Sequence, residues 1–161
     1  MIVVANAGPL IALAIVGHFD LLRSLYGEIH IPPAVRDEVV ASGKGRPGER
    51  AVQSASWIHT VEVQGATAIQ FLRDRLDAGE SEAIVPSMQL EADLLLMDEI
   101  RGRRVTEARG LNRTGTIGTL IAAKKQSLIP RLTPLLDELI AAGFRMSEDL
   151  YRTARSLAGE S

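Results

Sequence analysis

Residues 2–9 read IVVANAGP. The first four are largely β-branched and predict a short strand. Asn6 and Gly8 end this run, and Pro9 suits the first turn of a helix, where its missing N–H costs nothing. The chain therefore opens with a strand, a turn and a helix. Ligands of open α/β sheets bind outside the carboxyl ends of the strands, so side chains in such a turn are positioned for chemistry.

Residues 93–98, DLLLMD, form the clearest buried strand, because a continuous apolar run suits a parallel sheet covered on both faces. Shorter strands are expected at residues 28–31 and 57–63. Helices are expected at residues 9–25 (one bent helix or two short ones, because of Gly17), 33–41, 49–56, 66–76, 80–92 (kinked or shortened by Pro86), 99–109, 117–126, 131–142 and 147–158. Strands alternating with helices predict an α/β fold, a three-layer α/β/α sandwich with a mostly parallel central sheet.

The chain has 161 residues, of which 46% are hydrophobic. This length predicts one domain over residues 1–161, with the helices at about 131–158 packed on it. No Cys is present, so metal ligands must be hard oxygens or the three His, which show no ligand spacing and are expected to be structural. Oxygen ligands favour Mg²⁺ or Mn²⁺ over Zn²⁺.

The apolar amino terminus lacks the basic leading region of a signal peptide, and no stretch approaches the roughly 20 uninterrupted apolar residues of a membrane span. We therefore expect a soluble, cytoplasmic protein that binds no membrane. The net charge of -2 and the isoelectric point of about 5.9 are not those of a protein that holds nucleic acid over its whole surface. Any nucleic-acid contact must be local.

Four oxygen-bearing side chains lie near predicted strand-to-helix turns: Asn6, Glu38, Glu80 and Asp98. A carboxylate cluster of this kind can hold a divalent metal. Each residue also has an ordinary interpretation. Asn6 suits a turn, Glu38 a solvated helix face, Glu80 the first turn of a helix, and Asp98 a helix cap. Glu82 competes with Glu80, although it points roughly 200° away around the helix.

Several segments, taken together and in order, resemble a PIN domain, the metal-dependent ribonuclease fold of the VapC-like toxins. They are VVANAGPLIALAIVGHFDLL, IPPAVRDEVV, DAGESEAI, ADLLLMDEIRGRRV and LNRTGTIGTLIAAKK. The resemblance extends from residue 2 to about residue 158. It is closest to a bacterial and archaeal PIN-like family of unknown function.

The resemblance implies a site of acidic residues around one or two Mg²⁺ or Mn²⁺ ions. Its four positions fall on Asn6, Glu38, Glu80 and Asp98 as metal ligands, with the three acids as the catalytic residues. A family Thr or Ser that helps to hold the site matches Thr114 or Thr116. Most PIN nucleases have Asp where this chain has Asn6, so the site is one negative charge poorer. We expect Asn6→Asp to bind metal more tightly and to cleave RNA faster.

Three arginines follow the last acid: Arg101, Arg103 and Arg104. They could contact substrate phosphates, because guanidinium matches phosphate oxygens in bidentate fashion. The alternative is a solvated helix in which Glu99 pairs with Arg103.

The resemblance implies a metal-dependent endoribonuclease that hydrolyses RNA phosphodiester bonds, the toxin of a toxin-antitoxin pair. The expected partners are RNA, an antitoxin protein and a second copy of the chain. The apolar faces of the early helices are the predicted partner surface, through Leu10, Leu13, Leu21, Leu22 and Leu25, although these leucines could instead pack on the sheet. One rival is a non-catalytic nucleic-acid or protein-binding module with a weakened metal site. Another is a small-molecule phosphohydrolase, which would need an aspartyl nucleophile where Asn6 stands.

Overall fold

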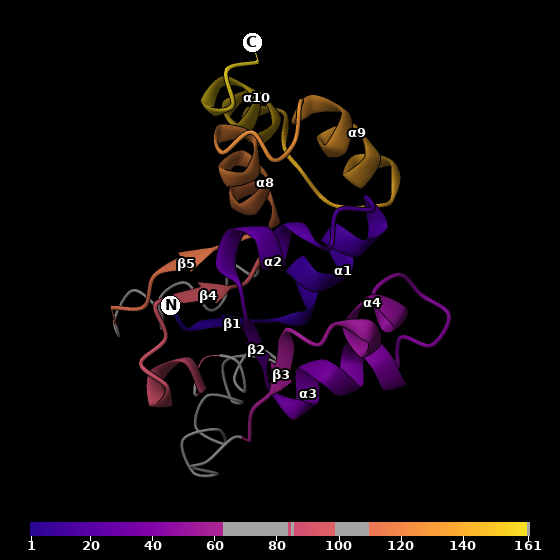
Figure 1. Cartoon of the computed structure of the whole chain (residues 1–161). Helices are drawn as coiled ribbons and strands as arrows, with labels where there is room; N and C mark the ends of the chain where they lie inside the picture. Colours follow the sequence, from indigo (N-terminus) through magenta and orange to yellow (C-terminus); the bar gives the residue numbers. More distant parts are fainter. Residues whose placement is uncertain (63–83, 85, 99–109, 161) are drawn as a thin grey trace.

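The computed structural model describes residues 1–62, 84, 86–98 and 110–160 (Figure 1). At its centre is a five-stranded sheet in which every neighbouring pair is parallel. The strands, in spatial order, are β3 (Ile58–Thr60), β2 (Ile29–Ile31), β1 (Val3–Ala5), β4 (Leu94–Leu96) and β5 (Arg113–Thr114). The prediction of an α/β fold with a parallel sheet is confirmed.

The strand order reverses its direction between β1 and β4. The chain passes from β1 outward to β2 and β3 on one side, and β4 and β5 occupy the other side of β1. In open α/β sheets, the helices that leave two such strands diverge and leave a crevice at the carboxyl ends. Fold topology alone therefore directs attention to the residues that follow β1 and β4.

Alternate side chains of the strands supply two apolar cores on opposite faces of the sheet, as the period of two requires. One face carries Val3 and Ala5 into a large core. The helices that contribute to this core are α1 (Ala7–Ile15), α2 (Leu21–Tyr26), α3 (Pro33–Arg36), η1 (Asp37–Ala41), α4 (Glu49–Ser54), α8 (Thr116–Lys125), α9 (Thr133–Ala141) and α10 (Glu148–Leu157). The other face carries Val4 and Leu95 into a smaller core with Ile84.

The segment 9–25 forms two helices rather than one bent helix. Gly17 has φ +72°, a left-handed conformation that ends α1 and that other residues rarely adopt. Of the early leucines, Leu10, Leu13, Leu21 and Leu22 are buried in the core of the chain itself. Leu25 is partly buried against the same core, so the alternative that these leucines pack within the chain is the one observed.

The second connection, after β2, begins at Pro32 and runs through α3 into η1, a turn of π-helix. The π-helical bond joins Ser42 N–H to Asp37 O at 2.8 Å, five residues apart along the chain. Val35 and Val39 are buried, as their spacing of four predicts. The expected helix is present, and its last turn is wider than an α-helix.

The three helices α8, α9 and α10 gather at one end of the molecule (Figure 1). Ser147 caps α10 as predicted, since its hydroxyl accepts a hydrogen bond from Leu150 N–H at 3.1 Å. Glu160, just beyond α10, folds back to accept hydrogen bonds from Leu132 N–H and from the side chain of Lys124. These contacts join α10 to the start of α9 and to the end of α8.

The expected helices at 66–76 and 99–109 lie outside the described residues, as do residues 80–83 and 85 of the helix expected at 80–92. Residues 86–89 are helical, and Pro86 lies in this short helix. No helix in the described part of the chain is long and apolar enough to cross a membrane.

Candidate active site at the switch point of the sheet

Asn6 and Asp98 follow the two strands that flank the switch point. Asn6 comes directly after β1, and its N–H donates to Leu96 O on β4 at 2.8 Å. Asp98 lies two residues beyond that carbonyl. The parallel pairing of Ala5 with Leu96 brings these two residues, remote in sequence, to the same carboxyl edge.

The Asp98 carboxylate is oriented by one residue at the start of α8. Its Oδ1 accepts a hydrogen bond from Thr116 N–H at 2.7 Å, and its Oδ2 accepts one from the Thr116 hydroxyl at 2.7 Å. Thr116 is fully buried, whereas Asp98 is partly exposed. Of the two threonines expected near the site, Thr116 makes this contact. Thr114 takes part in the sheet through its carbonyl, which accepts from Met97 N–H at 2.9 Å.

Two glycines leave the space that the Asp98 carboxylate occupies. A Cβ on Gly115 would lie 2.5 Å from Oδ1, and a Cβ on Gly8 would lie 3.2 Å from Oδ2. The first distance is too short for any side chain, and the second is tight. Gly8 belongs to the first turn of α1 and Gly115 precedes α8, so the carboxylate lies against the amino ends of both helices, where negative charge is stabilised.

Asn6 is 7% exposed and forms the amino-terminal cap of α1. Its Oδ1 accepts a hydrogen bond from Ala7 N–H at 2.8 Å. The ordinary interpretation of Asn6 as a turn residue is thus correct for its oxygen. This cap does not by itself exclude a second role for the side chain.

Glu38 lies on η1 and is exposed. Helix η1 packs beside α1, and Gly48, which follows the loop after η1, lies against both Val39 and Ile11. Within the described ranges, no group of three or more His, Asp or Glu residues is close enough to hold a metal. The predicted ligand Glu80 and its competitor Glu82, together with Arg101, Arg103 and Arg104, lie outside the described residues.

The family model for PIN domains matches residues 2–160. The chain belongs to the PIN-domain family. PIN domains are generally metal-dependent nucleases, and their fold agrees with the parallel sheet and its flanking helices. Comparisons with curated proteins and with solved structures gave no match.

Among the described residues, Asp98 supplies one carboxylate of the hard-oxygen kind that binds the divalent metals of PIN domains. A carboxylate has about four acceptor positions, and the described residues fill two of those on Asp98. Asp98 is a partly exposed hard oxygen donor, and no side chain at Gly8 or Gly115 obstructs it. The donor chemistry therefore suits Mg²⁺ or Mn²⁺.

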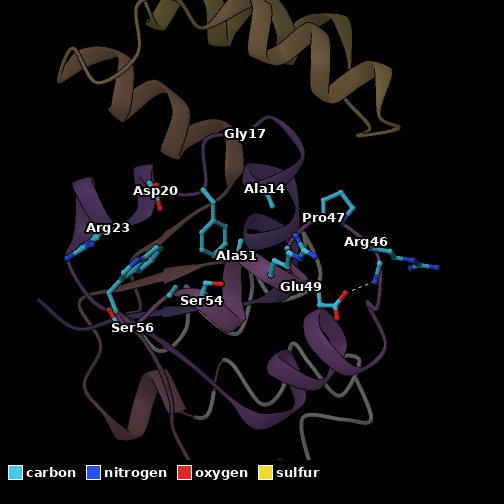
Figure 2. A pocket seen from close by; sticks show the side chains of 16 residues that line it. Ala14, Gly17, Asp20, Arg23, Arg46, Pro47, Glu49, Ala51, Ser54 and Ser56 are labelled. Carbon is cyan, nitrogen blue, oxygen red and sulfur yellow. Dashed lines mark hydrogen bonds between the residues drawn. The ribbon is translucent and has the colours of Figure 1, made fainter.

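A separate hollow of about 940 Å³ lies away from these residues (Figure 2). Phe19 and Trp57 belong to its lining, with ring centroids 5.4 Å apart. Arg23 and Arg46 lie on opposite sides of it. Its lining includes Ala14, near the carboxyl end of α1. Because an α-helix rises 1.5 Å per residue, Ala14 lies about 12 Å along the helix axis from Asn6. The hollow is thus a feature of the opposite end of α1, and it contains none of the candidate site residues.

Sequence reasoning missed Gly8 and Gly115, whose role depends on the position of Asp98. Their positions in the sequence could have indicated this role. Gly8 is two residues after Asn6, and Gly115 lies between Thr114 and Thr116. It also missed that His30 and His59 are register partners on β2 and β3, with ring centroids 5.7 Å apart.

Proposed function

We propose that this PIN domain is a metal-dependent endoribonuclease that hydrolyses RNA phosphodiester bonds, and that it is the toxin of a toxin-antitoxin pair. The observation that carries the nuclease proposal is the Asp98 carboxylate at the switch point, which two hydrogen bonds from Thr116 orient. The toxin role, with an antitoxin and a second copy of the chain as partners, rests on the likeness to VapC-like toxins.

Asp98 would hold the dication together with Glu38 and Glu80, and Arg101, Arg103 and Arg104 would contact the RNA backbone. Mg²⁺ or Mn²⁺, when bound, would lower the pKa of a water molecule and neutralise charge on the scissile phosphate. Thr116 has a positioning task, because its two hydrogen bonds fix both oxygens of Asp98. The amino ends of α1 and α8 add a positive potential that favours an anionic substrate at this edge.

The test is cleavage of a labelled RNA with Mg²⁺ or Mn²⁺ by wild-type protein and by Asp98→Asn. The substitution keeps an oxygen that can accept from Thr116 N–H, so the fold is retained while one negative charge is lost. We expect cleavage to fall by about a hundredfold or more.

Asp93→Asn is the matched control. Asp93 lies just before the same strand, β4, where its Oδ2 accepts a hydrogen bond from Ile2 N–H at 2.6 Å. It is far from the carboxyl edge, and this variant should keep full activity. Equal cleavage by wild type and Asp98→Asn would contradict the assignment. No cleavage by the wild type, with metal still bound, would favour the alternative of a non-catalytic binding module.

A further inference from the structure

The Asn6 side chain has two chemically different ends, and the structure assigns one of them. The oxygen end, Oδ1, caps α1 through the hydrogen bond from Ala7 N–H at 2.8 Å. The backbone of Asn6, with φ -85° and ψ 169°, has the extended conformation typical of an amino-terminal cap. The acceptor of this amide is therefore directed towards the helix.

The nitrogen end, Nδ2, takes no part in this cap, because Ala7 N–H is bonded to the oxygen of the amide. No described residue accepts a hydrogen bond from Nδ2. The surroundings belong to the candidate site. Asn6 N–H is bonded to Leu96 O, two residues before Asp98, and the Gly8 position in the same first turn of α1 is within 3.2 Å of Asp98 Oδ2. Asn6 thus carries a neutral N–H donor on a residue whose backbone lies beside the strand that leads to Asp98.

A donor and a carboxylate favour different ligands. A carboxylate attracts a cation, whereas an N–H group is complementary to an anionic oxygen and its partial positive charge opposes a metal. We propose that Asn6 is a substrate-contacting residue rather than a metal ligand, and that its Nδ2 donates a hydrogen bond to a non-bridging phosphate oxygen of the RNA backbone. This inference rests on the proposed nuclease function.

The opposing possibility is that Oδ1 uses its second lone pair to bind the metal while it caps α1. The two roles differ in what Asn6→Ser removes. Serine caps a helix about as well as asparagine, so the cap is preserved. Serine has no donor that reaches as far as Nδ2, so a contact made by that atom is lost. The melting temperature of Asn6→Ser should equal that of the wild type whether Asn6 contacts the substrate or the metal.

Two measurements on the full chain separate the roles. Calorimetric titration with Mn²⁺ alone reports the metal site. Anisotropy of a short fluorescent RNA at saturating Ca²⁺ reports the substrate contact, because Ca²⁺ prefers a larger and looser coordination shell than Mg²⁺ and is expected to support binding with little cleavage.

We expect Asn6→Ser to leave the Mn²⁺ dissociation constant within about twofold of wild type and to weaken RNA binding by about tenfold, the loss expected for a hydrogen bond to a charged acceptor. Asn6→Asp should bind Mn²⁺ more tightly and RNA more weakly, because it replaces a donor with a negative charge.

Weaker Mn²⁺ binding by Asn6→Ser, with RNA affinity unchanged, would overturn the proposal and assign Asn6 to the metal. Asp98→Asn serves as the reference for a metal ligand and should lose Mn²⁺ binding. If the wild type binds neither Mn²⁺ nor RNA, the nuclease proposal itself fails. If Asp98→Asn loses Mn²⁺ binding but Asn6→Ser changes neither measurement, only the role of Asn6 is refuted.

Discussion

Two carboxylates in this protein have the same structural task but different surroundings. Asp98 accepts from the first N–H of α8, and Glu160 accepts from Leu132 N–H and Thr133 N–H at the start of α9. Each is a helix cap supplied from a distant part of the sequence, 18 residues away for Asp98 and 28 residues away from Leu132 for Glu160.

The difference lies in the acceptor positions that remain. The four hydrogen bonds that Glu160 accepts fill both of its oxygens, and they come from Leu132 N–H, Thr133 N–H, the Thr133 hydroxyl and Lys124 Nζ. Its side chain is 9% exposed. The described residues give Asp98 two hydrogen bonds, both from Thr116. Glu160, whose acceptor positions are filled and which pairs with a lysine, holds the helices together. Asp98 keeps acceptor positions that no described residue fills, so it can take a ligand.

Among the residues that support the two carboxylates, the largest effect should come from the glycine that makes room for Asp98. In Gly115→Ala the new Cβ would lie 2.5 Å from Oδ1, so the carboxylate must move and lose its alignment with Thr116. We expect about a hundredfold loss of RNA cleavage and about 2 kcal/mol lower stability to urea. Gly8→Ala is the graded control, because its Cβ would lie 3.2 Å from Oδ2 and a small shift accommodates it. Equal effects of the two substitutions would contradict a steric origin.

Glu160→Gln should lower stability without changing activity. The substitution keeps the size of the side chain but removes the charge that pairs with Lys124 and strengthens the bonds from Leu132 and Thr133. We expect about 2 kcal/mol lower free energy of unfolding in urea titrations. Metal-dependent RNA cleavage at 25 °C should be unchanged. A parallel loss of Mn²⁺ affinity would show that α8 transmits the disturbance from Lys124 at one end to Thr116 at the other.

The same residue makes stability depend on pH. Burial alone would raise the pKa of Glu160, but the hydrogen bonds from Leu132, Thr133 and Lys124 outweigh it and hold the pKa well below its usual value of 4.5. A carboxylate with a lowered folded-state pKa contributes fully above the unfolded-state pKa, and its contribution is lost as the pH falls towards the folded-state pKa. The unfolding free energy of the wild type should therefore fall below about pH 4.5. Glu160→Gln should flatten this fall. An unchanged slope would mean that other groups dominate acid unfolding.

The smallest effect should follow the loss of one hydroxyl. Thr116→Val removes the bond to Asp98 Oδ2 and keeps the backbone bond to Oδ1. We expect about 1 kcal/mol lower stability and about tenfold slower cleavage. Thr116→Ser keeps the hydroxyl and should restore most of the activity. Full activity of the valine variant together with a loss in the serine variant would indicate that packing of the threonine methyl group, rather than the hydrogen bond, supports Asp98.

The features that could be predicted from the sequence depend on interactions between residues that are close together in the chain. Ser147 was recognisable as a cap because the hydrogen bond that it accepts lies three residues ahead, and Gly17 marked the break between α1 and α2 because backbone conformation is local. The continuous apolar sequence of β4 likewise predicted a strand in a parallel sheet that is covered on both faces. The candidate positions Asn6 and Asp98 followed from strand ends and from the family resemblance together.

The parts that could not be predicted are long-range. That Asp98 caps α8 depends on β4 and β5 being neighbours. The saturation of Glu160 depends on how α8, α9 and α10 pack. The separate roles inferred for the oxygen and the nitrogen of the Asn6 amide depend on the hydrogen bond from Ala7 N–H, which no residue pattern reveals.

The pairing of β1 with β4 also constrains when the site can form. These two strands are neighbours in the sheet but lie far apart in the sequence. Ile2 N–H, just before β1, donates a hydrogen bond to Asp93, just before β4, across 91 residues. Closing so long a loop is entropically costly, and parallel strands of large sequence separation pair slowly during folding. Thr116, which orients Asp98, follows later still. During synthesis, a ribosome-bound fragment that ends before this threonine therefore lacks the residue that fixes the carboxylate, and the emerging chain cannot have an assembled site until α8 has formed.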